Sequence, residues 1–128
     1  MVAPARPTGA LARERRAQVR RAVRIIALVA RYYYVDPADL RRPDRRPEIV
    51  EPRQVAMYLL HELRWPLCRG QVALPYQVIA RLLSRDNSTV QHGVAAIGRR
   101  IRSDPDVRCV VEDLQAMIAG ERGWSSSR

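Results

Sequence analysis

The apolar residues between Leu74 and Ile101 recur every three or four positions, in two runs separated by a short polar turn. This spacing places them on one side of an α-helix, so the segment predicts two helices that both face a core. Residues 84–86 supply the turn, and the second helix begins at about Asn87. The two apolar stripes consist of Val78, Ile79, Leu82 and Leu83, and of Val90, Val94, Ile97 and Ile101.

Start signals and apolar spacing predict the other helices. A long helix begins at Ala10 and keeps its apolar spacing up to Tyr33. A second begins at Pro52, and Asp104 caps a last one that ends at Gly120. Asp36, followed by Pro37, starts one short helical turn, and residues 65–73 are predicted to be a loop. Because strand alternation is absent, the expected fold class is all-α, a compact bundle of about five to six helices that contains a helix-turn-helix.

One folded domain with two extensions is expected. Residues 1–17 are interpreted as a flexible basic arm and lead-in helix, residues 18–120 as the domain, and residues 121–128 as a disordered tail. Within the domain, residues 41–47 (RRPDRRP) hold two prolines and five charged side chains. This composition cannot continue a helix and predicts an exposed basic loop.

The chain is strongly basic, with 23 basic residues against 13 acidic ones. All the basic residues are arginine, and the absence of lysine excludes a Walker phosphate-binding loop and Schiff-base chemistry in these residues. Residues 1–53 carry 13 arginines against six acidic residues, whereas residues 103–128 carry three against five. We therefore expect one basic face, built from the first helix, the 41–47 loop and the middle of the chain, that binds nucleic acid or another anionic surface.

No catalytic or metal site is predicted. The two histidines, His61 and His92, and the two cysteines, Cys68 and Cys109, lack the spacing of metal ligands, and no nucleophile–base pair is suggested. Neither a cofactor nor a small-molecule substrate is expected. Each cysteine has apolar neighbours in the sequence and is expected to be reduced and structural. A signal peptide and a long uncharged apolar run are absent, which favours a cytoplasmic location and no membrane partner.

The outer face of the helix that begins near Asn87 is small and polar. Its members opposite the apolar stripe are Ser88, His92, Ala95 and Arg99, flanked by Thr89 and Gln91. Short side chains allow close approach to the major groove, and hydroxyl and amide groups can read base edges. The free N–H groups at the start of this helix can also meet a phosphate.

Two long motifs resemble the C-terminal DNA-binding domain (domain IV) of the bacterial replication initiator DnaA. SRDNSTVQHGVAAI is similar to the family signature GGRDHTTVxHAxxKI, and PRQVAMYLLHEL is similar to PRQxAMYLxxEL. The resemblance covers about residues 18–120, with the motifs in the family's order. It implies a Trp-repressor-like helix-turn-helix fold that binds double-stranded DNA.

The resemblance implies a role for each matching residue. In the basic loop, Arg45 enters the minor groove with Arg46 beside it. The resemblance implies that Arg53 and Gln54 contact phosphates and that Pro75 makes an apolar contact in the major groove. Backbone contacts are implied for Arg85, Thr89 and His92, and base reading for Asp86, Asn87 and Ser88. Gln91 stands where many members touch a thymine methyl.

Several positions depart from the family pattern. Asn87 replaces a histidine, and because asparagine pairs well with adenine, base preference at one position can shift. Leu83 and Ser84 replace paired glycines, so a slightly different turn is expected, and the loop at 64–73 is longer than usual. The expected target is a box similar to TTATNCACA.

DnaA carries an ATPase module ahead of this domain, whereas only residues 1–17 precede it here. The expected protein is a stand-alone domain without ATPase activity that regulates replication initiation or nearby transcription. A fragment of a longer chain remains an alternative, although the initial Met and the arginine-rich head favour a complete protein. The other alternative is an adaptor that docks on DnaA or the replicative helicase through the first helix, Trp65 or Trp124.

Overall fold

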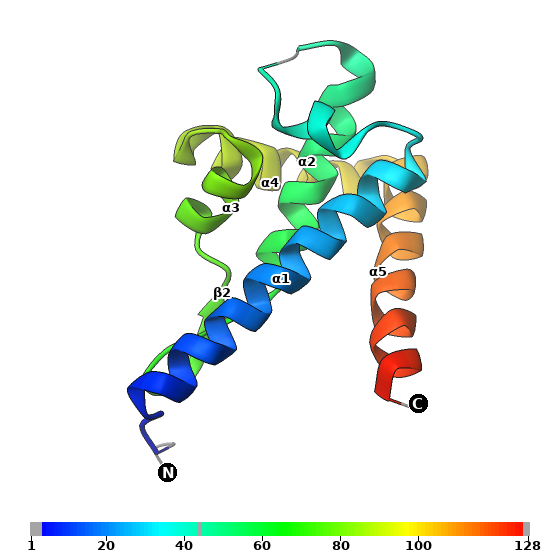
Figure 1. The fold of residues 1–128 in the computed structure, drawn as a ribbon. Coiled ribbons are helices and arrows are strands. Elements are labelled where there is room, and N and C mark those ends of the chain that lie inside the picture. Colours follow the sequence, from blue (N-terminus) through cyan, green and yellow to red (C-terminus); the bar gives the residue numbers. More distant parts are fainter. Residues whose placement is uncertain (1–3, 44, 127–128) are drawn as a thin grey trace.

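The computed structural model describes residues 4–43 and 45–126, with side chains as far as Gly120. It consists mainly of helices, with one small hairpin (Figure 1). In chain order the elements are α1 (Thr8–Tyr32), the 3-10 helix η1 (Pro37–Arg41), α2 (Pro47–His61), β1 (Arg64–Pro66), β2 (Gln71–Ala73), α3 (Tyr76–Leu83), α4 (Asn87–Ser103) and α5 (Pro105–Ser126). The all-α prediction is confirmed, with the hairpin as an addition.

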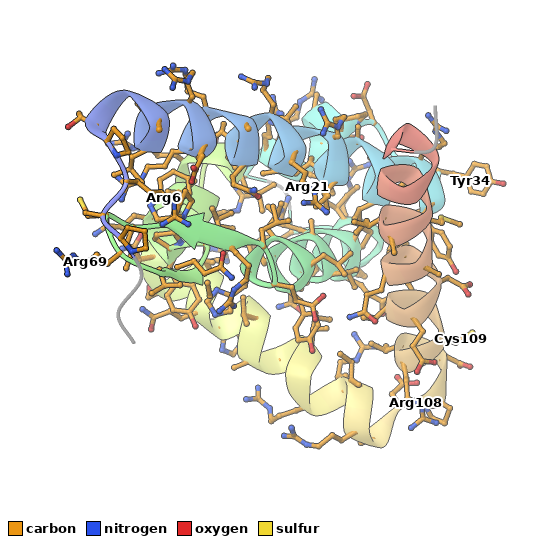
Figure 2. The ribbon with its side chains drawn as sticks, turned by 90° about the horizontal axis from the view of Figure 1, so that it is seen from below. Arg6, Arg21, Tyr34, Arg69, Arg108 and Cys109 are labelled. Carbon is orange, nitrogen blue, oxygen red and sulfur yellow. The ribbon has the colours of Figure 1, made fainter. Side chains whose placement is uncertain are left out.

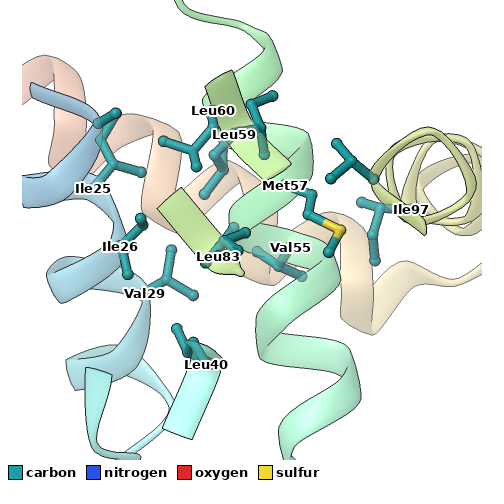
Figure 3. Close-up of a cluster of buried hydrophobic side chains, with 14 of the residues drawn as sticks. Ile25, Ile26, Val29, Leu40, Val55, Met57, Leu59, Leu60, Leu83 and Ile97 are labelled. Atoms are coloured by element: carbon teal, nitrogen blue, oxygen red, sulfur yellow. The ribbon is translucent and has the colours of Figure 1, made fainter. Parts of the chain in front are cut away.

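Helix α2 lies at the centre of the bundle and packs against both α1 and α4. The side chains between the helices are almost entirely aliphatic (Figure 3). From α1, Ile26 and Val29 are fully buried, and they meet Leu60 of α2 and Leu83 of α3 in the same cluster. Ile97 brings α4 into this core on the other side of α2.

The helix starts predicted at Asp36 and Asp104 are confirmed by capping hydrogen bonds, and Asp86 caps α4 in the same way. The Asp36 carboxylate accepts from the Ala38 N–H at 2.9 Å, and that of Asp86 accepts from the Thr89 N–H at 2.8 Å. At the start of α5, Asp104 accepts from the Asp106 N–H at 3.0 Å. Each carboxylate satisfies a donor that the first helical turn leaves free, which explains why these short-range signals set the helix starts correctly.

The segment predicted to be a loop at 65–73 contains an antiparallel hairpin, in which Trp65 pairs with Val72. Its turn closes where the Leu67 N–H donates to the Gly70 carbonyl at 3.1 Å, with Gly70 at φ +80°. Strands of three residues are too short to show alternation in the sequence. Their pairing with each other and the packing of β1 against α1 therefore could not be predicted.

Helix α1 begins at Thr8 rather than Ala10, and its first turns are not a separate arm. The Arg6 side chain donates to the carbonyls of Leu67 and Gly70, each at 2.7 Å, and the Arg15 side chain donates to the Pro66 carbonyl at 3.0 Å. The helix of the predicted lead-in is present from Thr8, and the side chains of Arg6 and Arg15 attach this segment to the hairpin. Residues 1–3 lie outside the described part of the chain.

Two other helix limits differ from the prediction. Helix α2 begins at Pro47, so Pro52 lies inside it and not at its start. Pro47 suits the first turn, whose N–H groups have no partner within the helix, whereas Pro52 is the sixth residue of α2 and removes one i→i−4 hydrogen bond. Helix α5 continues past the predicted end at Gly120 to Ser126. Cys68 and Cys109 are both exposed, which corrects the expectation of structural cysteines.

Candidate nucleic-acid interface

The turn between α3 and α4 joins the two helices of the helix-turn-helix. Ser84 adopts the left-handed conformation at φ 53° and ψ 48°, and the Arg85 N–H then donates to the Ala80 carbonyl at 2.9 Å. This is the αL helix ending that glycine usually supplies. The Ser84 side chain is exposed, whereas Leu83, which stands in place of the other glycine, is buried in the core.

The start of α4 is organised around the Asp86 carboxylate. Its Oδ1 accepts from the Thr89 N–H and, at 3.0 Å, from the Ser88 hydroxyl. Hydrogen bonds from the Thr89 side chain, from the Thr89 N–H and from Ser88 hold the pKa of Asp86 below its usual value. The carboxylate is thus ionised at neutral pH, and it orients the Ser88 hydroxyl while it caps the helix.

The outward face of α4 is free of the core, as the sequence predicts. The side chains of Asn87, Ser88, Thr89, Gln91 and His92 are all exposed. On the other side of the helix, Val90, Gly93 and Ile97 are buried. The helix therefore presents a run of amide, hydroxyl and imidazole groups to solvent near its N-terminus, where its dipole also favours an anion.

Gly93 allows α4 to cross α2 closely. A Cβ atom built at this position would lie 2.5 Å from the Met57 Sδ and 3.4 Å from the Gln54 Cγ. Gln54 is half-buried at this crossing, two residues after Pro52, where the sequence placed the helix start. Pro75 is half-buried at the N-cap of α3, so part of its ring is open to a partner.

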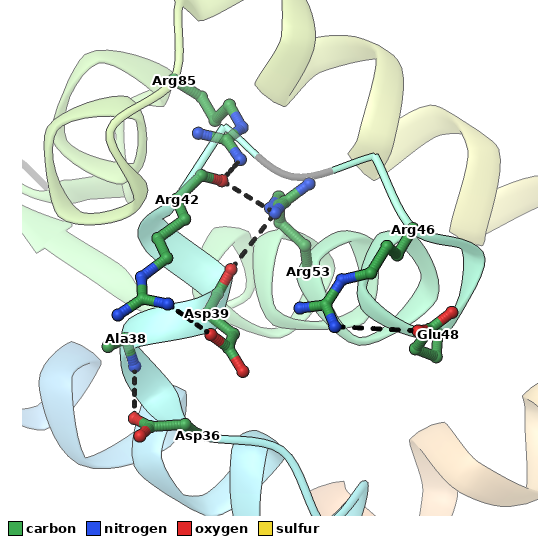
Figure 4. Close-up of polar contacts among 8 residues, drawn as sticks. All are labelled: Asp36, Ala38, Asp39, Arg42, Arg46, Glu48, Arg53 and Arg85. Carbon is green, nitrogen blue, oxygen red and sulfur yellow. Dashed lines mark hydrogen bonds and ion pairs between the residues drawn. The ribbon is translucent and has the colours of Figure 1, made fainter.

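The basic loop is attached to the helix-turn-helix through one main-chain oxygen, the Arg42 carbonyl. The Arg85 side chain donates to this carbonyl from the α3–α4 turn, and the Arg53 side chain donates to it from α2 at 3.0 Å (Figure 4). Arg53 donates further to the carbonyls of Asp39 and Leu40, at 3.3 Å and 3.0 Å. Two guanidinium groups therefore hold the loop beside the turn.

This arrangement changes the expected role of Arg53. Its side chain is only 6% exposed and is engaged with the loop carbonyls, so we assign it to positioning the loop and not to gripping a phosphate. Arg85 is half-buried and shares this bracing role. By contrast, Arg45 and Arg46 are exposed in the same loop, although Arg46 lies 3.9 Å from the Glu48 carboxylate. Asp44 lies outside the described residues.

The role of the Arg42 carbonyl could not be predicted from the sequence, because every residue has a backbone oxygen and no residue type marks this one. Helix α1, which the sequence assigned to the basic face, lies on the opposite side of α2 from α4 (Figure 2). The alternative docking residue Trp65 is half-buried beneath the Arg15 guanidinium, 5.0 Å from its ring centre. The Trp124 side chain lies outside the described ones.

The described residues contain neither a metal-binding cluster nor a helix that could span a membrane. No group of three or more His, Cys, Asp or Glu side chains is placed to hold a metal ion. No helix in the same part of the chain has the length and hydropathy needed to cross a bilayer.

The geometry agrees with one known family. A family model described as the bacterial DnaA protein helix-turn-helix matches residues 22–97. The chain belongs to this family. The matched range includes α2, α3 and most of α4, and thus the turn, the basic loop and the exposed N-terminal face of the helix-turn-helix.

Full-length DnaA proteins show the same relationship. The chain is 37% identical over 98 residues to chromosomal replication initiator protein DnaA 1 of Chlamydia muridarum. It is 38% identical over 95 residues to DnaA of Thermomicrobium roseum. These alignments cover 74% and 73% of this chain but only 20% and 19% of the relatives, so the chain spans about a fifth of their length.

Two solved structures share the fold. A DNA replication initiation factor superposes with a TM-score of 0.70 at 26% identity, and replication initiator DnaA bound to AMPPCP and single-stranded DNA superposes with a TM-score of 0.61 at 26% identity. The alignments cover 87% and 86% of this chain and 32% of each solved chain. The fold, together with the family match, makes this chain a DnaA-type helix-turn-helix domain.

Proposed function

We propose that this domain binds double-stranded DNA at DnaA-box-like sites and thereby regulates replication initiation or nearby transcription. The observation that carries the proposal is the exposed polar start of α4, held beside a basic loop by two arginines. In this arrangement α4 enters the major groove while Arg45 reaches the adjacent minor groove. The nucleoid is the corresponding location in the cell.

We assign base reading to Asn87 and Ser88, with the Asp86 carboxylate orienting the serine hydroxyl. Thr89, and His92 one turn after Ser88, are exposed and are proposed to contact the strands. We include the half-buried Gln54 and Pro75 in this surface, and Gln91, beside His92, is available for a base edge. Asn87 can pair with adenine through both N6 and N7, which supports a preference different from that of a histidine there.

Catalysis is not part of the proposed role. The chain contains no lysine, so these residues supply no Walker loop for ATP. Occupation of a site is then the whole activity of the domain, and its effect on initiation follows from competition with, or recruitment of, other proteins at the same site. Binding without turnover suits a regulator of a DNA site.

The test is a fluorescence-anisotropy titration with a duplex that carries a TTATNCACA box and with a random duplex of equal length. Ser88→Ala should weaken binding to the box by about 1–3 kcal/mol and leave the random duplex unchanged. Ser103→Ala is the matched control, because this serine is exposed at the other end of the same helix. An equal loss of affinity for both duplexes would show that Ser88 does not read a base.

Arg45→Ala is a second test of the proposal. We expect this substitution to weaken binding and to relax the sequence preference in the A/T-rich half of the box. Arg108→Ala removes an equally exposed arginine from α5 and should have little effect. If about 6–10 phosphates are contacted, wild-type affinity should fall roughly 10³–10⁵-fold between 50 and 200 mM salt. A wild-type domain with no preference for any duplex sequence would overturn the proposed function.

A further inference from the structure

A line of exposed arginines runs along α1 on the side away from the core. Its members, named here the α1 arginine stripe, are Arg13, Arg16, Arg20, Arg24 and Arg31. At 100° per residue they fall within about 80° of one another around the helix axis. The buried residues of α1, Ile25 and Val29 among them, lie on the opposite side of the helix.

The stripe has no counter-charge within the described part of the chain. None of its five guanidinium groups makes an ion pair or hydrogen bond with a described residue, whereas Arg6 pairs with Glu14 at 2.7 Å. A solvated helix face usually mixes both signs at i, i+4 spacing, because like charges there destabilise the helix by about 0.2–0.5 kcal/mol per pair. Arg16, Arg20 and Arg24 stand at that spacing, and a polyanion would relieve their repulsion.

The stripe faces away from the proposed DNA-reading surface. Helix α2 separates α1 from α4, and in Figure 2 α1 lies along one edge of the molecule while α4 lies along the other. Nitrogen-tipped side chains project from the outer edge of α1 in that view, whereas Arg21, which is labelled, points inward. A straight duplex in contact with α4 and the basic loop cannot also lie on this stripe.

A phosphate backbone matches the stripe better than a lipid surface does. The stripe extends for about 27 Å, the rise of an 18-residue helical span, and would run beside roughly eight base pairs of B-DNA. Guanidinium groups bind phosphates in a forked geometry. Membrane-surface helices instead insert a broad apolar face, and the apolar face of α1 is buried in the core, while Ala17 and Ala27 between the arginines are small.

We propose that the α1 arginine stripe is a second, sequence-independent binding surface for duplex DNA, so that one domain can hold two duplex segments together. This surface acts independently of the α4 site, which selects the first duplex. The second duplex is recognised by its phosphates alone. Its binding is therefore more sensitive than binding of the first duplex to substitutions that remove charge.

The test is a capture assay. A duplex with a TTATNCACA box is immobilised, the domain is added, and retention of a fluorescent random duplex is measured. The triple variant Arg16→Gln, Arg20→Gln, Arg24→Gln should lose capture while it still binds the box within about two-fold. The matched control is Arg64→Gln, Arg69→Gln, Arg108→Gln, which removes the same charge from scattered exposed positions and should retain both activities. Circular dichroism verifies that each variant is folded.

Salt dependence gives a quantitative test that uses the random duplex alone. With Arg45→Ala and Ser88→Ala in the background, removal of the three stripe arginines should make the log–log salt slope of random-duplex binding less steep by up to about 2.7, whereas the control triple variant should leave this slope nearly unchanged. The comparison of the two triple variants does not require that the box is the target of α4, so failure of either proposal is recognisable.

Three results would overturn the proposal. The triple glutamine variant could capture the second duplex as well as the wild type does. It could lose box binding and capture together, which would place the stripe on the same duplex as α4. Finally, the wild type could retain vesicles of anionic phospholipid but no second duplex, in which case a lipid surface is the occupant.

Discussion

At the residue scale, a single left-handed backbone conformation sets the angle between α3 and α4. Ser84 holds it at φ 53° without the freedom that glycine has there. Residue-scale contacts also divide the arginines of the site by role. Arg53 and Arg85 have their guanidinium groups on carbonyl oxygens, and Arg45 has its group in solvent. The same residue type thus braces the loop at two positions and remains available to a partner at another.

Ser84→Gly should stabilise the domain. A non-glycine residue in the left-handed region is strained, and relief of this strain should exceed the entropic cost of glycine, for a net gain of about 0.5–1 kcal/mol in the free energy of unfolding. Ser103→Gly is the control, because this serine lies in the last turn of α4 and should lose stability. Chemical denaturation of both variants measures the difference, and a loss in Ser84→Gly would contradict the strain.

At the element scale, the closeness of α4 to α2 depends on one position without a side chain. Gly93 faces Met57 and Gln54 across the crossing, and both neighbours lie in α2. Gly98 is on the same helix one and a half turns later, and a Cβ atom there would lie 3.9 Å from the Tyr58 ring, an ordinary contact. The two glycines therefore differ in tertiary surroundings while they share a helix.

Gly93→Ala should destabilise the domain by about 1–3 kcal/mol, because overpacking against Met57 outweighs the better helix propensity of alanine. Gly98→Ala should instead be neutral or stabilising by up to about 1 kcal/mol. Urea denaturation separates these outcomes. If Gly93→Ala were as stable as Gly98→Ala, the close crossing of α2 and α4 would be wrong.

At the scale of the whole molecule, a chain of polar contacts connects four helices. The hydroxyl of Tyr33, the residue that follows α1, donates to the Glu51 carboxylate of α2 at 2.9 Å, and Arg100 of α4 pairs with the other oxygen of Glu51 at 2.9 Å. Arg100 also pairs, at 3.3 Å, with Asp104, the residue that caps α5. This network fixes the far end of α4 and leaves its N-terminal turns free to face a partner.

The network predicts a loss of stability at high pH. Burial, and then the hydrogen bond to Glu51, raise the pKa of Tyr33 well above its usual value. Because the folded chain favours the neutral phenol, this stabilisation is complete below about pH 10, the ordinary tyrosine pKa, and is lost as pH rises through the higher pKa of the folded state. Urea denaturation between neutral pH and pH above 10 should show this decline.

Tyr33→Phe should reduce the decline, because it removes the titrating group. Tyr34→Phe is the matched control, since Tyr34 is the next residue and is 96% exposed, and it should keep the full decline. Equal declines in the two variants would mean that Tyr33 does not hold its proton more tightly in the folded chain.

Features that depend on neighbouring residues could be predicted from the sequence alone. Asp36 and Asp104 marked helix starts because a cap acts within three residues, and the spacing of Val90 and Ile97 showed which side of α4 is buried. The exposed polar face of α4 followed from the same periodicity. Family motifs added the roles that these positions are proposed to have.

The contacts between segments that are distant in the sequence could be seen only in the folded structure. The docking of Arg6 on the hairpin joins residues 61 and 64 positions apart, and the contact of Arg85 with the Arg42 carbonyl joins residues 43 positions apart. Such contacts use main-chain oxygens, which every residue has, so no pattern of side chains in the sequence predicts them. The burial of Arg53 and the outward position of the α1 arginine stripe follow from packing around α2, a property of the assembled bundle and not of any local segment.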